Sequence, residues 1–200
     1  MRIRHCWFVL GFLILACAPR EGRAALLMRE TDDLRLLYRD VVHSALAPHV
    51  ARCFENAMGF YRGTLGYEPS QRVTVLLDDS SDFNNASAFS TPRNTLLVQI
   101  APASMVYETL PGNERINHTL NHELAHIVAL DRMHGADRTF RALFGGKVAI
   151  TNSHPETIAY QYLTNPRFAA PRWFHEGFAV FLETWMAGGI GRAQGPYAVR

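Results

Sequence analysis

The chain has 200 residues, a formal net charge of +2, 48% hydrophobic residues and 19% charged residues. This composition is typical of one packed globular domain, and it excludes a disordered chain, a coiled coil and a collagen-like repeat. The charges are nearly balanced and the basic residues form no stripe, so nothing in their distribution indicates nucleic-acid binding.

The first 24 residues have the pattern of a secretory signal. Two arginines precede an apolar run over residues 6–18, which is too short to span a bilayer. Two cleavage sites are compatible with the pattern. Residues 14–17 resemble a bacterial lipobox, in which Cys17 is lipidated and becomes the first mature residue, whereas residues 22–24 suit ordinary signal peptidase. We expect residues 1–24 to be removed as a signal peptide or lipoprotein signal.

This signal predicts an exported protein. The lipobox places it in the bacterial periplasm or in the outer membrane as a lipoprotein, with the lipid on Cys17 as its only membrane contact. The ordinary cleavage site would also allow secretion. In either case Cys53 is the only cysteine left outside the signal region, so no disulfide framework is expected and Cys53 is predicted to be a buried thiol.

Residues 25–70 are predicted to form an N-terminal helical region. Apolar residues recur at helical spacing within residues 34–41 and again within residues 54–65. Pro48 is expected to divide this stretch into two helices, because proline disrupts a helix interior. Gly66 is expected to end the second helix.

Residues 71–200 are predicted to begin with strands and continue with helices, which makes the fold class α+β. The β-branched run at residues 72–77 and residues 95–100 read as strands joined by a polar loop. Helices are expected at residues 113–130, with Asn113 as the cap, and at residues 138–144, 155–163 and 171–187. The Gly- and Ala-rich end at Arg200 suggests a C-terminally truncated domain.

One motif in the predicted helix 113–130 carries chemistry. The sequence His122-Glu123-Leu124-Ala125-His126 places two histidines four residues apart, so they lie one turn apart on the same helix face. Two imidazoles so placed can bind one Zn²⁺ at about 2.0–2.1 Å each. Glu123 lies beside that line, where its carboxylate can take a proton from zinc-bound water. The alternative is a pair of ordinary, partly exposed histidines.

Two histidines leave zinc under-coordinated, so a third ligand is needed. The extended spacing HExxHxxGxxH is absent, because Ala129 and Arg132 stand where it requires Gly and His. The better candidate is Glu176, which lies further downstream in the segment Trp-Phe-His-Glu-Gly-Phe-Ala at residues 173–179.

That segment resembles the second motif of the gluzincins, zinc metallopeptidases that include the thermolysin-like and aminopeptidase-N-like families. The resemblance implies a zincin-like domain in which His122, His126 and Glu176 bind zinc and Glu123 is the general base. It also implies that Glu183, two turns after Glu176, orients one of the zinc ligands. His175 is expected to point to another side of the helix. His118, four residues before His122, is expected to be a supporting or surface histidine.

The resemblance extends to the region before the HExxH helix. In peptidase-MA-like zincins a strand, a loop and an edge strand precede that helix. The residues expected to form the substrate-binding edge strand here are Leu97, Val98, Gln99 and Ile100. An edge strand binds an extended peptide through main-chain hydrogen bonds. The alternative is an ordinary core strand.

The chain also departs from the best-known gluzincins. The gap between His126 and Glu176 is longer, as in the broader peptidase-MA-like group, and Val180 replaces the Asp of thermolysin-like enzymes. The aminopeptidase Gly-x-Met-Glu-Asn motif is absent, so exopeptidase activity is not indicated.

The sequence therefore predicts a zinc-dependent peptidase, with one Zn²⁺ per chain, that cleaves internal bonds of a peptide or protein substrate. Two alternatives from other classes stay open. One is a zinc-stabilised scaffold without activity, and the other is an envelope binding module whose metal site is intact but idle. The oligomeric state is not indicated by any feature of the sequence.

Overall fold

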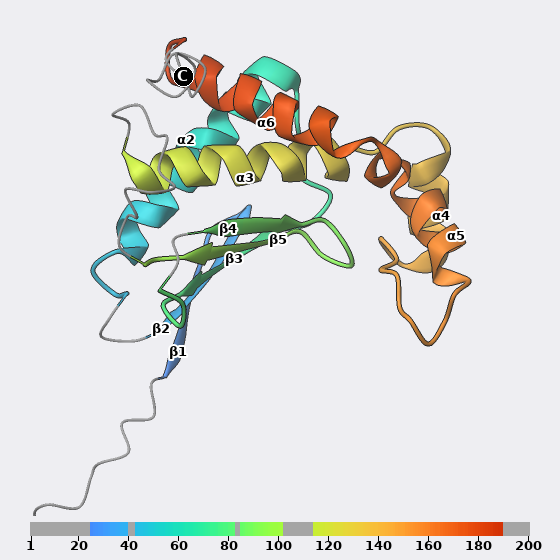
Figure 1. The fold of residues 1–200 in the computed structure, drawn as a ribbon, viewed down its shortest axis with the longest axis horizontal. Coiled ribbons are helices and arrows are strands. Elements are labelled where there is room, and N and C mark those ends of the chain that lie inside the picture. The colour runs from blue at the N-terminus through green and yellow to red at the C-terminus, as the bar shows by residue number, and fades with distance from the viewer. Residues whose placement is uncertain (1–24, 40–42, 83–84, 102–113, 190–200) are drawn as a thin grey trace, which may run out of the picture.

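A five-stranded mixed sheet forms one layer of the fold (Figure 1). The computed structural model describes residues 25–39, 43–82, 85–101 and 114–189. The spatial order of the strands is β1-β2-β3-β5-β4. The three inner strands β2, β3 and β5 run parallel, and β1 and β4 pair antiparallel at the two edges. The strands are β1 (Leu26–Glu30), β2 (Leu34–Arg39), β3 (Val73–Asp78), β4 (Ala86–Phe89) and β5 (Thr95–Gln99).

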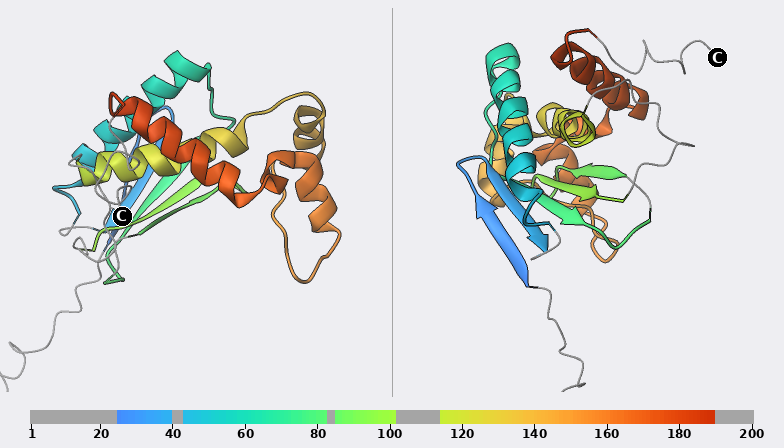
Figure 2. Two further views of the ribbon diagram at one scale, coloured as in Figure 1. Left: turned by 45° about the horizontal axis from the view of Figure 1, so that its top comes forward. Right: turned by 90° about the vertical axis from the view of Figure 1, so that its left-hand side faces the viewer.

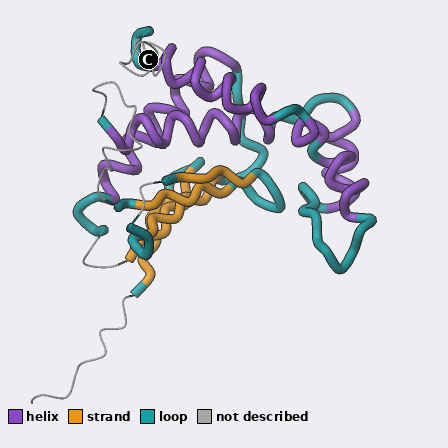
Figure 3. The backbone as a smooth tube through the Cα atoms, in the orientation of Figure 1, coloured by secondary structure: helices purple, strands orange, loops and turns teal. Residues whose placement is uncertain are grey.

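Helices form the second and third layers on one face of this sheet (Figure 3). Helix α2 lies over β2, helix α3 lies over β4 and β5, and α6 packs along α3 (Figure 2). The smaller helices stand beyond the C-terminal end of α3 (Figure 1). The helices are α2 (Ala47–Leu65), α3 (Arg115–Asp131), α4 (Ala136–Phe144), α5 (Thr157–Thr164), the 3₁₀ helix η1 (Pro166–Ala169) and α6 (Arg172–Met186).

The core lies between the sheet and helices α2 and α3. Alternate residues of β3 are buried, so Val73, Val75 and Leu77 face the helices. Both helices bury an apolar stripe against them, and Phe54 of α2 and Leu124 of α3 are fully buried. Period-two burial in the strands and period-3.6 burial in the helices therefore meet in one continuous core.

The α+β class and most of the predicted elements are confirmed. Strands β3 and β5 and helices α3, α4, α5 and α6 lie within a few residues of their predicted positions. Gly145 adopts a left-handed conformation that closes α4, as the sequence indicated. The capping residue of α3 is Glu114, whose carboxylate accepts hydrogen bonds from the backbone N–H groups of Ile116 and Asn117. The predicted cap, Asn113, lies outside the described residues.

The prediction of a wholly helical region at residues 25–70 is wrong. Residues 26–30 and 34–39 are strands, and only α2 is helical there among the described residues. Pro48 does not divide two helices but occupies the first turn of α2, where its missing N–H costs no hydrogen bond. β2 pairs with β3, so one sheet runs across the boundary expected at residue 70.

Strand β4 was not predicted, because Ala86–Phe89 lies in a segment that reads as a polar loop. It changes the identity of the edge strand. β5 pairs with β3 on one side and with β4 on the other, so Leu97, Val98 and Gln99 belong to an inner strand. Ile100 follows that strand and donates its backbone N–H to Asp78. The edge next to the HExxH helix is β4.

The expected signal, including Cys17, and the end at Arg200 lie outside the described residues. Within the described part of the chain, no helix is long and apolar enough to cross a membrane. Cys53 is a buried free thiol, and its burial was expected.

Candidate metal centre

The HExxH motif lies in the middle of α3, a helix buried along much of its length. Its two histidines project from consecutive turns to the same side, and their Nε2 atoms lie 3.2 Å apart. The helix is fixed by Glu114 at its first turn and by core contacts of Leu120 and Leu124. The local sequence therefore determines that His122 and His126 converge.

Glu176 reaches the two histidines from α6. Its Oε2 atom lies 3.5 Å from His122 Nε2 and 3.8 Å from His126 Nε2. Buried Ala179 and Leu182 hold α6 against α3, which sets the distance between the two helices. The long connection between the motifs contains α4, α5 and η1, so the large sequence separation does not prevent the third residue from joining the first two.

The donor set and its spacing fit a zinc ion. Two imidazole nitrogens and one carboxylate oxygen lie within 4.8 Å of one another. A tetrahedral zinc with ligands at about 2.0–2.1 Å separates neighbouring ligand atoms by roughly 3.3 Å. The three observed separations, 3.2, 3.5 and 3.8 Å, lie close to that value. His122, His126 and Glu176 are thus the residues that would hold the metal.

Burial and the neighbouring His122 lower the pKa of His126 to about 4, although Glu176 opposes this shift. A neutral imidazole is therefore favoured at neutral pH, because a proton on His126 would be poorly solvated beside another histidine. The neutral ring is the form that binds a metal.

Glu183 supports the cluster from the far side of His122. Its Oε2 atom lies 2.7 Å from His122 Nδ1, and the residue is only 2% exposed. His118 Nε2 lies 3.5 Å from the same oxygen. A carboxylate at Nδ1 favours the tautomer that carries the proton there, which leaves the Nε2 lone pair directed toward Glu176 and His126. Glu183 thus contacts a candidate ligand, as the resemblance implied, and His118 is buried beside Glu183 and not on the surface.

Glu123 is buried and lies on the wall of the same cavity as the three candidate ligands. This cavity has a volume of about 730 Å³ and opens between α3, α6 and strand β4. Its lining residues are Asn85, Ala86, Ser87, Ala88, His122, Glu123, His126, Leu130, Phe168, Ala170, Arg172, His175 and Glu176.

The cavity lining corrects two sequence-based expectations. Leu97–Gln99 and Ile100 do not line it, and the adjacent segment 85–88 does. His175 was expected to point elsewhere on its helix, yet it lines the cavity together with Glu176. The exposed Arg172 also contributes, with Nε 3.6 Å from Glu176 Oε1. The sequence gives little indication of these contributions, because which α6 side chains face the cavity depends on how α6 is rotated against α3.

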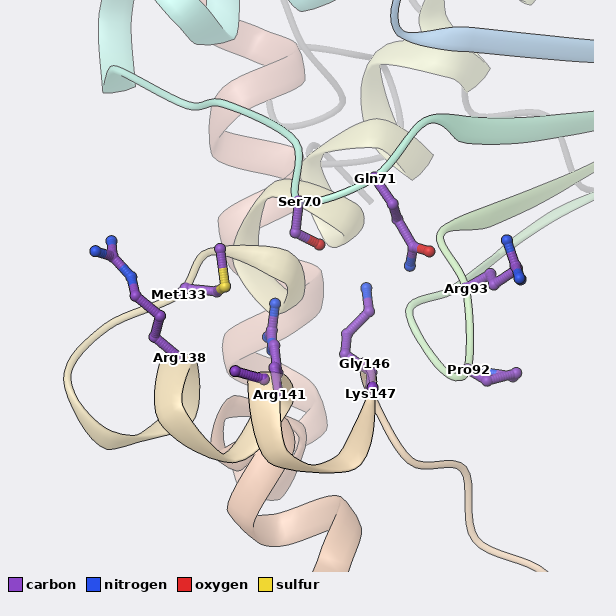
Figure 4. Close-up of a pocket in the computed structure, with 11 residues that line it drawn as sticks. Ser70, Gln71, Pro92, Arg93, Met133, Arg138, Arg141, Gly146 and Lys147 are labelled. Carbon is purple, nitrogen blue, oxygen red and sulfur yellow. The ribbon is translucent and has the colours of Figure 1, made fainter.

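A second cavity, of about 600 Å³, lies near the C-terminal end of α3 and contains none of the predicted site residues (Figure 4). Its wall carries four cationic side chains. Arg141 and Lys147 point toward Ser70, whereas Arg93 and Arg138 point away in opposite directions (Figure 4).

The two inward cations of this cavity pair with a buried carboxylate. Asp131 accepts hydrogen bonds from Lys147 Nζ at 2.7 Å, from the Tyr67 hydroxyl at 3.0 Å and from the Ser70 N–H at 2.8 Å. Arg141 donates to the backbone carbonyl of Asp131 at 2.7 Å. This network anchors the end of α3 to the loop before β3 and to the segment after α4, which gives it a structural role.

Comparison of the chain with models of protein families, with curated proteins and with solved structures gives no match. The fold and the site by themselves define the class of this protein. It is an α+β domain with a His-His-Glu cluster in an open cavity beside the edge of its sheet.

Proposed function

We propose that this protein is a zinc-dependent peptidase that cleaves internal bonds of an extended peptide or protein. One observation carries the proposal. The donor atoms of His122, His126 and Glu176 lie within 4.8 Å of one another, on the wall of a cavity that also contains Glu123 and borders the edge strand β4. A closed structural zinc site usually relies on cysteine, whereas this donor set leaves a position open to the cavity.

Zinc bound to these three residues would supply a Lewis acid that polarises a carbonyl oxygen and acidifies water. The chain's own contribution to proton transfer is Glu123. Its carboxylate takes a proton from the attacking water and passes it to the nitrogen of the leaving amine. Burial of Glu123 limits its competing contacts with bulk water. His175 and Arg172 line the same cavity and are two candidate hydrogen-bond donors to the carbonyl oxygen.

The edge strand β4 supports an extended peptide as the substrate. One side of β4 is paired with β5, and no other strand within the described residues pairs with its second side. Main-chain groups on such an edge bind a peptide by adding a strand. Since segment 85–88 lines the cavity, a peptide added there would pass the His-His-Glu cluster. Recognition through the main chain needs no free terminus, which favours endopeptidase over exopeptidase activity.

The first test combines metal content with activity. We expect Glu176→Ala to lower bound zinc by one ion per chain relative to the wild type. Glu123→Gln should keep that zinc and lower the rate of cleavage of a peptide library by about 10²–10⁴-fold, the usual contribution of a general base. Glu156→Gln, an exposed residue of the α5 region, is the matched control and should change neither quantity.

Two outcomes would reject parts of this proposal. Unchanged zinc in Glu176→Ala would remove that residue from the metal centre. A wild-type protein that binds zinc but cleaves no peptide in the library would support the inactive scaffold or binding module instead.

We also propose that the protein is exported and anchored through a lipid on Cys17, on the basis of its first 24 residues. Metabolic labelling with a radioactive fatty acid should mark the wild type and not Cys17→Ala. Equal labelling of the two would reject the lipid anchor, and retention of the unprocessed chain in the cytoplasm would reject export.

A further inference from the structure

A second cluster of metal-ligating side chains lies away from the HExxH motif. His49 and Cys53 stand four residues apart in α2, so they occupy consecutive turns on one face. Glu114, the cap of α3, completes the group. Glu114 and His122 are eight positions apart on α3, which corresponds to roughly 12 Å along the helix axis. The two clusters therefore cannot share one ion.

The distances in this cluster match those around a tetrahedral zinc. Cys53 Sγ lies 3.6 Å from His49 Nε2, and His49 Nε2 lies 3.0 Å from Glu114 Oε2. All three donor atoms lie within 4.8 Å of one another. A zinc with sulfur at about 2.3 Å and nitrogen at about 2.0–2.1 Å separates those two ligands by roughly 3.6 Å.

The chemistry of the three groups favours the same class of ion. Thiolate, imidazole and carboxylate are all established zinc ligands, and a thiolate selects against the hard cations Mg²⁺ and Ca²⁺. Cys53 is buried, whereas His49 and Glu114 are partly exposed. The cluster therefore has a protected sulfur ligand and a solvent path by which an ion can enter. The alternative without a metal is a surface His–Glu contact beside a buried thiol. That alternative would not require all three donor atoms to converge.

We propose that His49, Cys53 and Glu114 form a second divalent-metal site of the zinc class, which fastens the start of α2 to the start of α3. Glu114 can keep its role as a cap in this arrangement. Its Oε1 atom accepts the N–H of Ile116 at 2.9 Å, and its Oε2 atom, which accepts the N–H of Asn117 at 2.8 Å, has a second lone pair for an ion. An ion here would stabilise the helix that carries His122 and His126. The proposal does not depend on the peptidase function.

Cobalt is the probe that separates the two sites, because only this one contains sulfur. The protein to be titrated with Co²⁺ is the full chain carrying Cys6→Ser and Cys17→Ser, so that Cys53 is the single thiol. We expect two bound Co²⁺ ions per chain and a near-ultraviolet thiolate-to-cobalt charge-transfer band. Cys53→Ser and His49→Ala should each abolish the band and one of the two ions. His126→Ala should remove the other ion and keep the band.

The His49→Ala variant guards against misfolding, because His49 is partly exposed and its loss leaves the buried thiol in place. Circular dichroism of each variant without metal verifies the fold. Cobalt binding to the folded full chain without a sulfur band would overturn the proposal, as would a band that survives in folded His49→Ala. As a second readout, Zn²⁺ should slow alkylation of Cys53 at least tenfold in the wild type and in His126→Ala, and not in His49→Ala. Equal alkylation rates with and without Zn²⁺ would also overturn the proposal.

Discussion

Replacing Glu183 by glutamine tests how strongly the residue behind His122 supports the metal centre. The buried Glu183 carboxylate lies 2.7 Å from His122 Nδ1. Glutamine keeps the size of the side chain and an oxygen that can accept a hydrogen bond, and it removes the negative charge. We expect Glu183→Gln to bind zinc at the His122 site more weakly than the wild type.

Two independent estimates give the size of the effect. A hydrogen bond to a charged group contributes about 1.5–3 kcal/mol, and each 1.4 kcal/mol corresponds to about a tenfold change in affinity. Residues that hydrogen-bond to a metal-ligating histidine usually contribute about 10–100-fold to metal affinity. Because glutamine retains a neutral acceptor, the expected loss is near the lower end, about tenfold.

The assay is competition for zinc between the protein and a chromophoric chelator. It is run in a Cys53→Ser background so that the His49 cluster does not contribute. Glu156→Gln is the matched control, because Glu156 also contacts a histidine, His154 at 3.1 Å, but is exposed and far from the cluster along the chain. The reasoning would be refuted if folded Glu183→Gln bound zinc as tightly as the wild type.

Two further predictions concern stability. Lys147→Met should lower the free energy of unfolding by about 3 kcal/mol, because Asp131 would stay buried without its closest cation. Arg35→Met removes an exposed ion pair with Glu30 and should lower it much less. Urea unfolding measures both, and equal losses would contradict the assigned importance of burial. The pKa of His126, lowered from 6.5 to about 4, predicts that the metal-free protein loses stability as the pH falls from 6.5 toward 4. In that window the unfolded histidine takes up a proton that the folded one does not. His126→Ala should flatten this part of the pH profile, and an unchanged slope in chelator-treated protein would rule out His126 as its source.

Elements whose signal is local could be predicted from the sequence. The HExxH helix, the alternating strand β3 and the glycine that closes α4 each depend on residues within one or two turns, and the structure has them close to their expected positions. The spacing of Glu176 and Glu183 on one helix is a local property of the same kind. It indicated that the two carboxylates share one helix face, whereas their separate roles were implied only by the resemblance to the gluzincins.

The errors fall where a residue's partner is remote in the chain. Segment 34–39 carries apolar residues at helical spacing, but it forms a strand because β3 offers it a parallel partner and a shared core. The short strand β4 has too few apolar residues to stand out, and it forms by pairing with β5. Because of that pairing, the edge of the sheet beside the cavity is segment 85–88 and not the predicted Leu97–Ile100.

The sequence by itself determined how the candidate site residues of the HExxH motif are arranged, since His122, Glu123 and His126 are fixed on their helix by its 3.6-residue period. Only the tertiary structure decided what surrounds them. The rotation of α6 against α3 places His175 on the cavity wall, and the packing of α2 beside α3 brings His49 and Cys53 to Glu114. Such contacts arise from side-chain packing between elements far apart in the chain, and no periodicity within one segment encodes them.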